Sequence, residues 1–265
     1  MDITPAPSPA AGRVFLVGAG PGDPELLTLK ALRLLSEADA VVYDSLVSPD
    51  VLGKTRPDCE RVFAGKKAGV PGCTQPEIDA MLIALARQGK RVVRLKGGDP
   101  FIFGRGGEEA AALVAAGVPF EVVPGVTSAL AAAAYAGIPL THRSHSSAVV
   151  LLTGHEDPSK PDASVHWEDF ARIGATLCIY MGMRNLEAIA DRLLAGGMSA
   201  ETPAALVQSA TTGEHRTVLA TLGTLASRAR EEGVKAPAMV IVGEVAALSR
   251  DLSWFENSIT ASCSI

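Results

Sequence analysis

Short apolar runs alternate with stretches of helical periodicity along the first half of the chain. The apolar runs predict buried strands at 13–18, 40–43, 91–95 and 120–123. The periodic stretches predict helices at 26–35, 76–89, 107–117 and 126–136. In the first helix Leu26, Leu29 and Leu32 repeat at helical spacing, with Leu27, Leu34 and Leu35 beside them. This alternation predicts a parallel sheet covered by helices.

The pattern restarts after about residue 140, which indicates a second unit of similar size. Its apolar runs predict strands at 147–153, 176–181, 203–208, 217–222 and 238–242. Its periodic stretches predict helices at 185–195 and 223–232. We therefore expect two consecutive α/β domains with mostly parallel sheets, at 13–140 and 141–250, between tails at 1–12 and 251–265.

Composition favours a small molecule as the ligand. The chain has 265 residues, of which 48% are hydrophobic and 20% charged, and its formal net charge is −5. This is the profile of a globular protein large enough to bury a sizeable core. A mildly acidic chain without a basic stripe argues against nucleic acid as the main partner, because phosphate binding needs clustered cations.

The chain carries no pattern that indicates a metal, a disulfide framework or a membrane. Its four cysteines are scattered without a Cys-x-x-Cys pair. The first residues contain neither a basic segment nor an apolar run, so we expect no signal peptide and a cytoplasmic location. The uncharged stretch at 122–141 is interrupted by Pro and Gly, which favours a buried helix over a membrane span. The length leaves no room for further catalytic modules, so we expect a single-function enzyme.

A glycine-rich loop follows the first predicted strand, at 18–24. In a parallel sheet, ligands bind beyond the carboxyl ends of the strands, so such loops are candidate site loops. The loop begins like a dinucleotide fingerprint, but Asp23 stands where the third glycine belongs. Pro21 and Pro24 also lack the backbone N–H groups that a pyrophosphate would accept. A tight turn between strand and helix is the structural alternative.

Two further loops follow the predicted strands at 91–95 and 120–123. The loop at 96–109 holds five glycines among charged and aromatic residues, which favours close approach of its backbone to a ligand. A mobile linker is the alternative, but it leaves Phe101 and Phe103 unexplained. In the loop at 123–129 the hydroxyl groups of Thr127 and Ser128 could simply cap the alanine-rich helix that follows.

Several motifs in one order resemble the tetrapyrrole methylase family, and within it the enzymes that methylate uroporphyrinogen III. The resemblance runs from about residue 14 to residue 248. The matching stretches are VGAGPGDP (17–24), VYDSLV (42–47), RLKGGDPFIFGRGGEE (94–109), VPGVTS (123–128), AYAGIPLTHR (134–143), YMG (180–182) and APA (236–238). The resemblance implies two α/β domains, S-adenosylmethionine held in the cleft between them, S-adenosylhomocysteine as product, and a homodimer.

The resemblance also implies which residues line the cofactor pocket. They are Pro21, Gly97, Gly98, Asp99, Ile102, Thr127, Ser128, Met181, Ala210, Pro237 and Ala238. Glycines let backbone amides approach the methionine end, Asp99 is an anion beside a cationic ligand, and Met181 offers apolar surface to the adenine. Ala210 stands where related enzymes often carry glycine.

Methyl transfer needs alignment and proton handling, because the sulfonium already supplies an activated methyl group. By resemblance, Asp44 matches the proton acceptor of the family and Lys66 its proton donor. Asp44 also fits the ribose-binding acid of a dehydrogenase or a helix cap, and Lys66 also fits a solvated loop lysine. Spacing alone leaves these alternatives open.

A substrate with eight carboxylates requires cations around it. We expect four candidates to contact it: Arg105, Arg143, Lys67 and Arg184. His142 and His145 stand close together in the sequence without a third ligand nearby, so we expect no metal.

Three functions compete at this point. The first is the transfer of two methyl groups to uroporphyrinogen III to give precorrin-2, through precorrin-1, for sirohaem or cobalamin. The second is methylation of a later corrin intermediate by a member of the same family. The third is a nicotinamide-dependent oxidoreductase built on the first glycine loop and Asp44, and a non-catalytic cofactor sensor is more remote. We expect the first.

Overall fold

The computed structural model describes residues 12–65, 72–158, 160 and 163–255. Within them the chain forms two compact units, residues up to Thr127 and residues from Ser128. The sequence places the boundary near 140 instead. The difference is the helix α5 (Ser128–Tyr135), which contacts the strands of the second sheet and therefore belongs to the second unit. The expected tail at 1–12 lies almost wholly outside the described residues.

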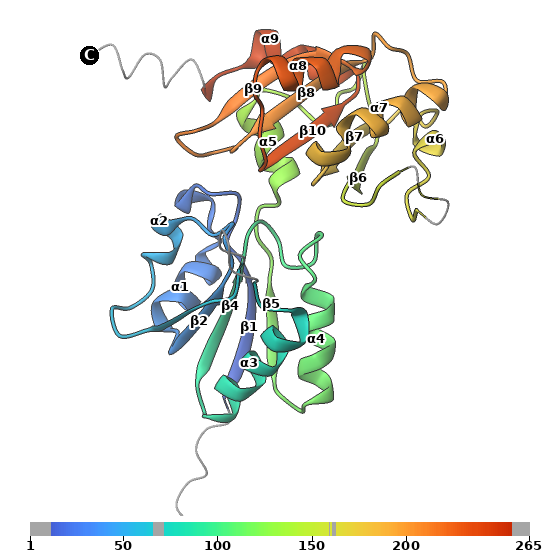
Figure 1. Ribbon diagram of the computed structural model, residues 1–265. Coiled ribbons are helices and arrows are strands. Elements are labelled where there is room, and N and C mark those ends of the chain that lie inside the picture. The colour runs from blue at the N-terminus through green and yellow to red at the C-terminus, as the bar shows by residue number, and fades with distance from the viewer. Residues whose placement is uncertain (1–11, 66–71, 159, 161–162, 256–265) are drawn as a thin grey trace, which may run out of the picture. The chain divides into compact units, whose positions relative to one another are not determined.

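The first unit is built on a five-stranded parallel sheet (Figure 1). Its strand order is β3-β2-β4-β1-β5, and all four pairings are parallel, as predicted. The strands are β1 (Arg13–Gly18), β2 (Ala40–Tyr43), β3 (Glu60–Phe63), β4 (Arg91–Lys96) and β5 (Phe120–Val123).

Helices cover both faces of this sheet because its strands are apolar on both sides. Val14 and Leu16 of β1 face α3 (Gln75–Arg87) and α4 (Gly106–Ala115). The alternate residues Phe15 and Val17 face α1 (Leu29–Glu37) and α2 (Pro49–Leu52). A 3₁₀ turn, η1 (Pro24–Leu26), precedes α1. Because helices cover both faces, a ligand is expected to bind at the carboxyl ends of the strands.

The first helix begins later than predicted, and only some of its leucines are buried. The Thr28 hydroxyl accepts a hydrogen bond from the Ala31 N–H at 3.1 Å, so the helix starts at Leu29. Leu29 is 86% exposed and Leu32 is 39% exposed. Ala31, Leu34 and Leu35 form the buried face instead. The helical spacing of the leucines was therefore confirmed from Leu29 onward, but the spacing did not determine which of them are buried.

The second unit is built on a five-stranded mixed sheet with the order β6-β7-β10-β8-β9. Its strands are β6 (Val149–Thr153), β7 (Thr176–Tyr180), β8 (Pro203–Gln208), β9 (Arg216–Thr221) and β10 (Ala238–Val242). Only β6 and β7 pair in parallel, and the other pairings are antiparallel. The two-domain α/β class is confirmed, but a mostly parallel sheet holds only for the first unit.

One of the antiparallel pairings follows directly from a connection in the second unit. A short loop joins β8 to β9, and a hairpin of this kind pairs its strands antiparallel. The helices α6 (Trp167–Phe170), α7 (Leu186–Ala195) and α8 (Leu225–Glu231) pack on one face. The opposite face carries α5. Short 3₁₀ segments are η2 (Met183–Asn185), η3 (Leu222–Thr224) and η4 (Glu244–Leu248).

The segment after residue 250 is attached to the second unit where it is described. The helix α9 (Ser249–Leu252) follows η4, and the Ser249 hydroxyl donates to the Ala136 carbonyl at 2.5 Å. The Trp254 indole N–H donates to the Ala134 carbonyl at 2.9 Å. The expected tail at 251–265 thus begins inside packed structure. In the described ranges no helix is long and apolar enough to cross a membrane.

Candidate functional site

Three loops meet at the carboxyl edge of the first sheet, after β1, β4 and β5. Gly20 and Gly98 exchange backbone hydrogen bonds, with N–H to O distances of 3.2 and 2.7 Å. A Cβ added to Gly125 would lie 2.3 Å from the Gly98 carbonyl oxygen, and one added to Gly18 would lie 2.6 Å from it. These glycines therefore allow the loops to approach one another. The three loops thus form one backbone platform. The sequence analysis explained the glycines by contact with a ligand alone, whereas the structure shows that they also let the loops contact one another.

Asp99 joins two of these loops. One carboxylate oxygen accepts the Phe101 N–H at 2.8 Å, and the other accepts the Gly125 N–H at 3.0 Å. The predicted cofactor residues Pro21, Gly97 and Ile102 lie half-buried in the same loops, and Thr127 is buried where the third loop ends. The platform thus brings together all the predicted cofactor residues of the first unit.

The loop between β4 and α4 contains two left-handed residues other than glycine. Phe103 has φ 52° and Arg105 has φ 59°, a conformation that costs free energy in most residues. Arg105 is the N-cap residue of α4, and its Nε donates to the Glu108 carboxylate at 3.0 Å. This ion pair raises the pKa of Arg105 and lowers the pKa of Glu108. The predicted substrate-binding cation is therefore exposed but already oriented.

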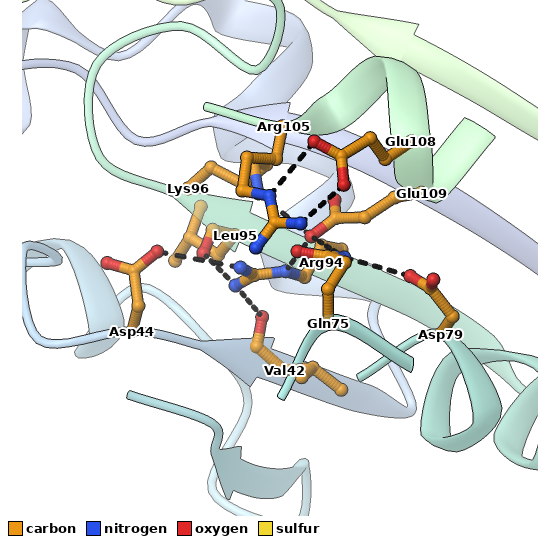
Figure 2. Close-up of polar contacts among 10 residues, drawn as sticks. All are labelled: Val42, Asp44, Gln75, Asp79, Arg94, Leu95, Lys96, Arg105, Glu108 and Glu109. Carbon is orange, nitrogen blue, oxygen red and sulfur yellow. Dashed lines mark hydrogen bonds and ion pairs between the residues drawn. The ribbon is translucent and has the colours of Figure 1, made fainter. Parts of the chain in front are cut away.

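A buried cluster of charges lies beneath this edge of the sheet, between β4 and α4 (Figure 2). Arg94 Nε and Lys96 Nζ both donate to Oε1 of Glu109, at 3.0 and 2.9 Å. The Glu109 side chain is fully buried, and the two cations are 5% exposed. Burial lowers the pKa of Lys96 and the Arg94 charge lowers it further, while Glu109 opposes both.

Asp44 lies at the exposed margin of this cluster. Its Oδ2 is 3.6 Å from Arg94 Nη2, and its side chain is 26% exposed. Arg94 Nη1 also donates to the Val42 carbonyl at 3.4 Å, two residues before Asp44 on the same chain segment. Oδ1 of Asp44 accepts the Leu46 N–H at 3.0 Å. A carboxylate in this position is available to a ligand while one cation supports it from behind.

The sequence analysis missed Arg94, Lys96 and Glu109 as members of the site. A signal was present, because Arg94 and Lys96 alternate with apolar residues after the first, exposed residue of the strand. Period-two spacing places both on one face of the strand, together with Val92, which packs against α3 and α4. Two cations on a buried face require a buried anion, and α4 supplies it.

In the second unit the predicted cofactor residues gather at one edge of the mixed sheet. Met181 follows β7 directly, with φ 55° and a side chain that is 49% exposed. Ala210 follows β8, and the N–H of its neighbour Ser209 donates to the Pro237 carbonyl at 3.0 Å. Pro237 and Ala238 stand where β10 begins, and β10 runs antiparallel to β7 and β8. Ser128, half-buried, is the first residue of α5.

The remaining predicted substrate cations are spread out. Arg143 is exposed in the loop that the His142 and Ser146 backbone pairing closes. Arg184 lies in η2 and lines a surface groove with Glu187, Arg230 and Lys235. Lys66 and Lys67 lie outside the described residues. Across the described ranges no group of three or more His, Cys, Asp or Glu side chains could hold a metal.

The structure is that of an α/β protein in which glycine-rich loops meet at the carboxyl edge of a parallel sheet. The family model of the tetrapyrrole (corrin/porphyrin) methylases matches residues 13–226. The chain therefore belongs to the tetrapyrrole methylase family.

The chain is also similar to named proteins and solved structures. A siroheme synthase from Stutzerimonas stutzeri is 54% identical over 252 residues, which are 95% of this chain and 54% of the relative. The chain thus spans about half the length of the curated relatives that it matches. Among solved structures, a uroporphyrin-III C-methyltransferase from Thermus thermophilus, complexed with S-adenyl homocysteine, is 46% identical with a TM-score of 0.74. The match covers 88% of this chain and 93% of that one.

A second solved structure, a cobalt precorrin-4 methyltransferase of cobalamin biosynthesis, is 32% identical with a TM-score of 0.81. The match covers 91% of this chain and 98% of the chain of that methyltransferase. Its fold is at least as similar as that of the Thermus enzyme, but its sequence is less so. The fold thus identifies the family, whereas the sequence separates its members.

Proposed function

We propose that this chain is a uroporphyrinogen-III C-methyltransferase that uses S-adenosylmethionine and releases S-adenosylhomocysteine. Two methyl groups are added to one uroporphyrinogen III, through precorrin-1, to give precorrin-2. The observation that carries the proposal is the 46% identity to a uroporphyrin-III C-methyltransferase across nearly the whole of both chains. The Asp44 carboxylate at the end of β2 supports it, since this chemistry needs a base.

The residues at both sheet edges fit S-adenosylmethionine. Met181 leaves an apolar side chain half-exposed at the end of β7, which suits an adenine ring. The loops around Asp99 offer backbone groups and a carboxylate for a ligand that carries ammonium and sulfonium charges. When bound, the cofactor supplies an activated methyl group. Ala210 keeps its proposed contact through the backbone, which glycine and alanine share.

The protein's own chemistry is the handling of a proton. After the methyl group joins a pyrrole carbon, a proton leaves the macrocycle, and Asp44 accepts it in this proposal. Arg94 stabilises the carboxylate from the buried side, and the Leu46 N–H holds its other oxygen. Lys66 is proposed as the proton donor. Arg105, Arg143, Lys67 and Arg184 are proposed to bind the substrate carboxylates.

The assembly and the cellular location belong to the same proposal. We infer a homodimer that works in the cytoplasm. The family resemblance supports the homodimer. Sedimentation analysis of the purified protein tests the dimer.

Calorimetry and label transfer test the proposed function. The purified protein is titrated with S-adenosylhomocysteine and with NAD, and is then incubated anaerobically with uroporphyrinogen III and methyl-labelled S-adenosylmethionine. We expect binding of the first ligand alone and labelled tetrapyrrole. Binding of NAD in its place would contradict the methylase and favour an oxidoreductase.

A later corrin intermediate is the second candidate substrate. The TM-score of 0.81 to a cobalt precorrin-4 methyltransferase favours it, whereas the lower identity of 32% does not. Transfer of label to a cobalt-corrin substrate, with none to uroporphyrinogen III, would move the assignment to this candidate.

A further inference from the structure

We propose that Glu109 is a positioning residue for the reaction, acting through Arg94 on Asp44. The inference rests on the proposed function, because it concerns the group assigned as proton acceptor. The Glu109 side chain is fully buried, so it does not reach the exposed edge where Asp44 lies. Its effect on the reaction is therefore indirect.

The contacts form one continuous path from α4 to the end of β2 (Figure 2). Glu109 Oε1 accepts Arg94 Nε at 3.0 Å, which fixes the guanidinium plane from behind. The other two guanidinium nitrogens then face the chain of Asp44, with Nη1 3.4 Å from the Val42 carbonyl and Nη2 3.6 Å from Asp44 Oδ2. A planar guanidinium held at one nitrogen has little freedom at the others. Glu109 thereby fixes where Arg94 meets Asp44.

The charge of Glu109 matters as well as its hydrogen bond. It neutralises two buried cations, because Lys96 Nζ donates to the same oxygen at 2.9 Å. Without this anion, Asp44 is the nearest remaining carboxylate that Arg94 contacts among the described residues. Arg94 would then pair more closely with Asp44 and move it from its position. In the intact cluster Glu109 competes for Arg94 and leaves Asp44 available to the substrate.

The second oxygen of Glu109 distinguishes this arrangement from a simple structural ion pair. Oε2 is buried and has no hydrogen-bond partner within the described ranges. Gln75 Nε2 lies 3.5 Å from Oε1 and donates at 2.9 Å to Asp79. A glutamate retained only for packing would be replaceable by an apolar residue, since burying an unpaired carboxylate oxygen is costly. A glutamate at this position fits a role in placing Arg94.

A double-mutant cycle tests the proposal. Glu109→Gln keeps the size of the side chain and an acceptor for Arg94 Nε but removes the charge. We expect kcat for methyl transfer to uroporphyrinogen III to fall about 10- to 100-fold, since misplacement by about 1 Å can cost about 10²-fold. KM values and affinity for S-adenosylhomocysteine should change less than about threefold. In an Asp44→Asn background, Glu109→Gln should lower the residual rate less than about threefold.

Matched variants keep the test decisive. Glu37→Gln removes a carboxylate that pairs with Arg33 and Arg91 at the surface of the same unit, and it should leave kcat unchanged.

If Glu109→Gln does not fold, Glu109→Gln combined with Lys96→Met removes one buried anion and one buried cation together. The same cycle is then run in that protein. If Asp44→Asn leaves no measurable rate, Arg94→Gln takes its place in the cycle.

The outcomes separate the inference from the function on which it rests. Absence of methyl transfer in the unmodified protein contradicts the proposed function. Transfer by the unmodified protein with kcat unchanged in Glu109→Gln overturns the inference alone. An equal loss of rate in the unmodified and Asp44→Asn backgrounds also overturns it, because a general structural defect acts on both. Loss in the first background only is the expected result.

Discussion

The two units bury different kinds of side chain in cores of similar construction. In the described part of the chain, every buried Arg, Lys, Asp or Glu belongs to the first unit, and the three of them form one cluster. The buried polar residues of the second unit are Ser, Thr and one His. Its core is otherwise apolar from Leu152 to Val242.

The difference indicates which part of the proposed chemistry each unit can perform. Buried charge is costly unless it is paired, so its concentration at one sheet edge indicates a function beyond stability. The second unit offers backbone groups and the exposed side chain of Met181 at its own sheet edge. We infer that proton chemistry belongs to the first unit, while the second contributes surface for binding the cofactor. The predictions below test this division.

The largest effect is expected at Asp44. Asp44→Ala should lower kcat by about 10²- to 10⁴-fold, the usual contribution of a general base, with S-adenosylhomocysteine binding nearly unchanged. Kinetic assay and calorimetry measure the two quantities. Asp44→Asn is the informative control, because it keeps an acceptor for the Leu46 N–H while removing the charge. Full activity of Asp44→Asn would contradict the role of Asp44 as proton acceptor and leave it only a role in the turn.

A core change in the second unit should act on stability instead. Leu206 is fully buried in β8, and Leu206→Ala should lower the free energy of unfolding by about 2–5 kcal/mol. The folded fraction should keep its kcat, because Leu206 lies in the apolar core of the second unit and the buried charged cluster belongs to the first. Urea unfolding and assay at low temperature measure both. Loss of kcat without loss of stability would break the division between the units.

Met181 should affect affinity more than rate. Met181→Ala should weaken S-adenosylhomocysteine binding by about 3- to 10-fold, since apolar contact is worth about 25 cal/mol per Å² buried. Met181→Leu keeps the apolar surface and should bind nearly as well as the unmodified protein. Calorimetry compares the two variants. Equal affinity in all three proteins would remove Met181 from the cofactor site.

The smallest effect concerns an exposed carboxylate of the first unit. Glu77 accepts the Thr74 backbone N–H at 2.7 Å and its hydroxyl at 2.8 Å, and these bonds lower the pKa of Glu77. Its stabilising effect is full above the usual glutamate pKa of about 4.3 and is lost as the pH falls through the lowered value. Glu77→Gln should therefore lower the thermal midpoint slightly at pH 7, and the difference should shrink progressively as the pH falls below the usual glutamate pKa. A difference independent of pH would refute the assignment.

Much of the fold follows from local patterns. The predicted strands at 13–18, 40–43, 120–123, 203–208 and 238–242 have the bounds of β1, β2, β5, β8 and β10. Continuous apolar runs identify such strands because both of their faces are buried. The short strand β3 was missed, since its edge position leaves Glu60 and Arg61 exposed.

Pairing direction was beyond the local pattern. A strand buried on both faces has the same sequence character in a parallel and in an antiparallel sheet. The second sheet was therefore predicted as mostly parallel, although β8, β9 and β10 pair antiparallel. The position of α5 was missed for a similar reason, because an alanine-rich helix does not encode which sheet it covers.

The site was predicted in part for physical reasons of the same kind. Glycine loops after strands identify the platform, because carboxyl ends of parallel strands share one edge. Asp44 and Arg105 were proposed from motifs, whereas Arg94 and Glu109 form their contact across 15 residues of sequence. Such a pairing depends on how α4 lies on β4, which the spacing of charges does not determine.

Counting methyl groups tests the central claim most directly. The purified protein is incubated without oxygen with uroporphyrinogen III and an excess of S-adenosylmethionine, and the mass of the tetrapyrrole product is measured. The account predicts a product with two added methyl groups and a matching amount of S-adenosylhomocysteine. An unmodified tetrapyrrole, in a protein that still binds S-adenosylhomocysteine, would contradict it.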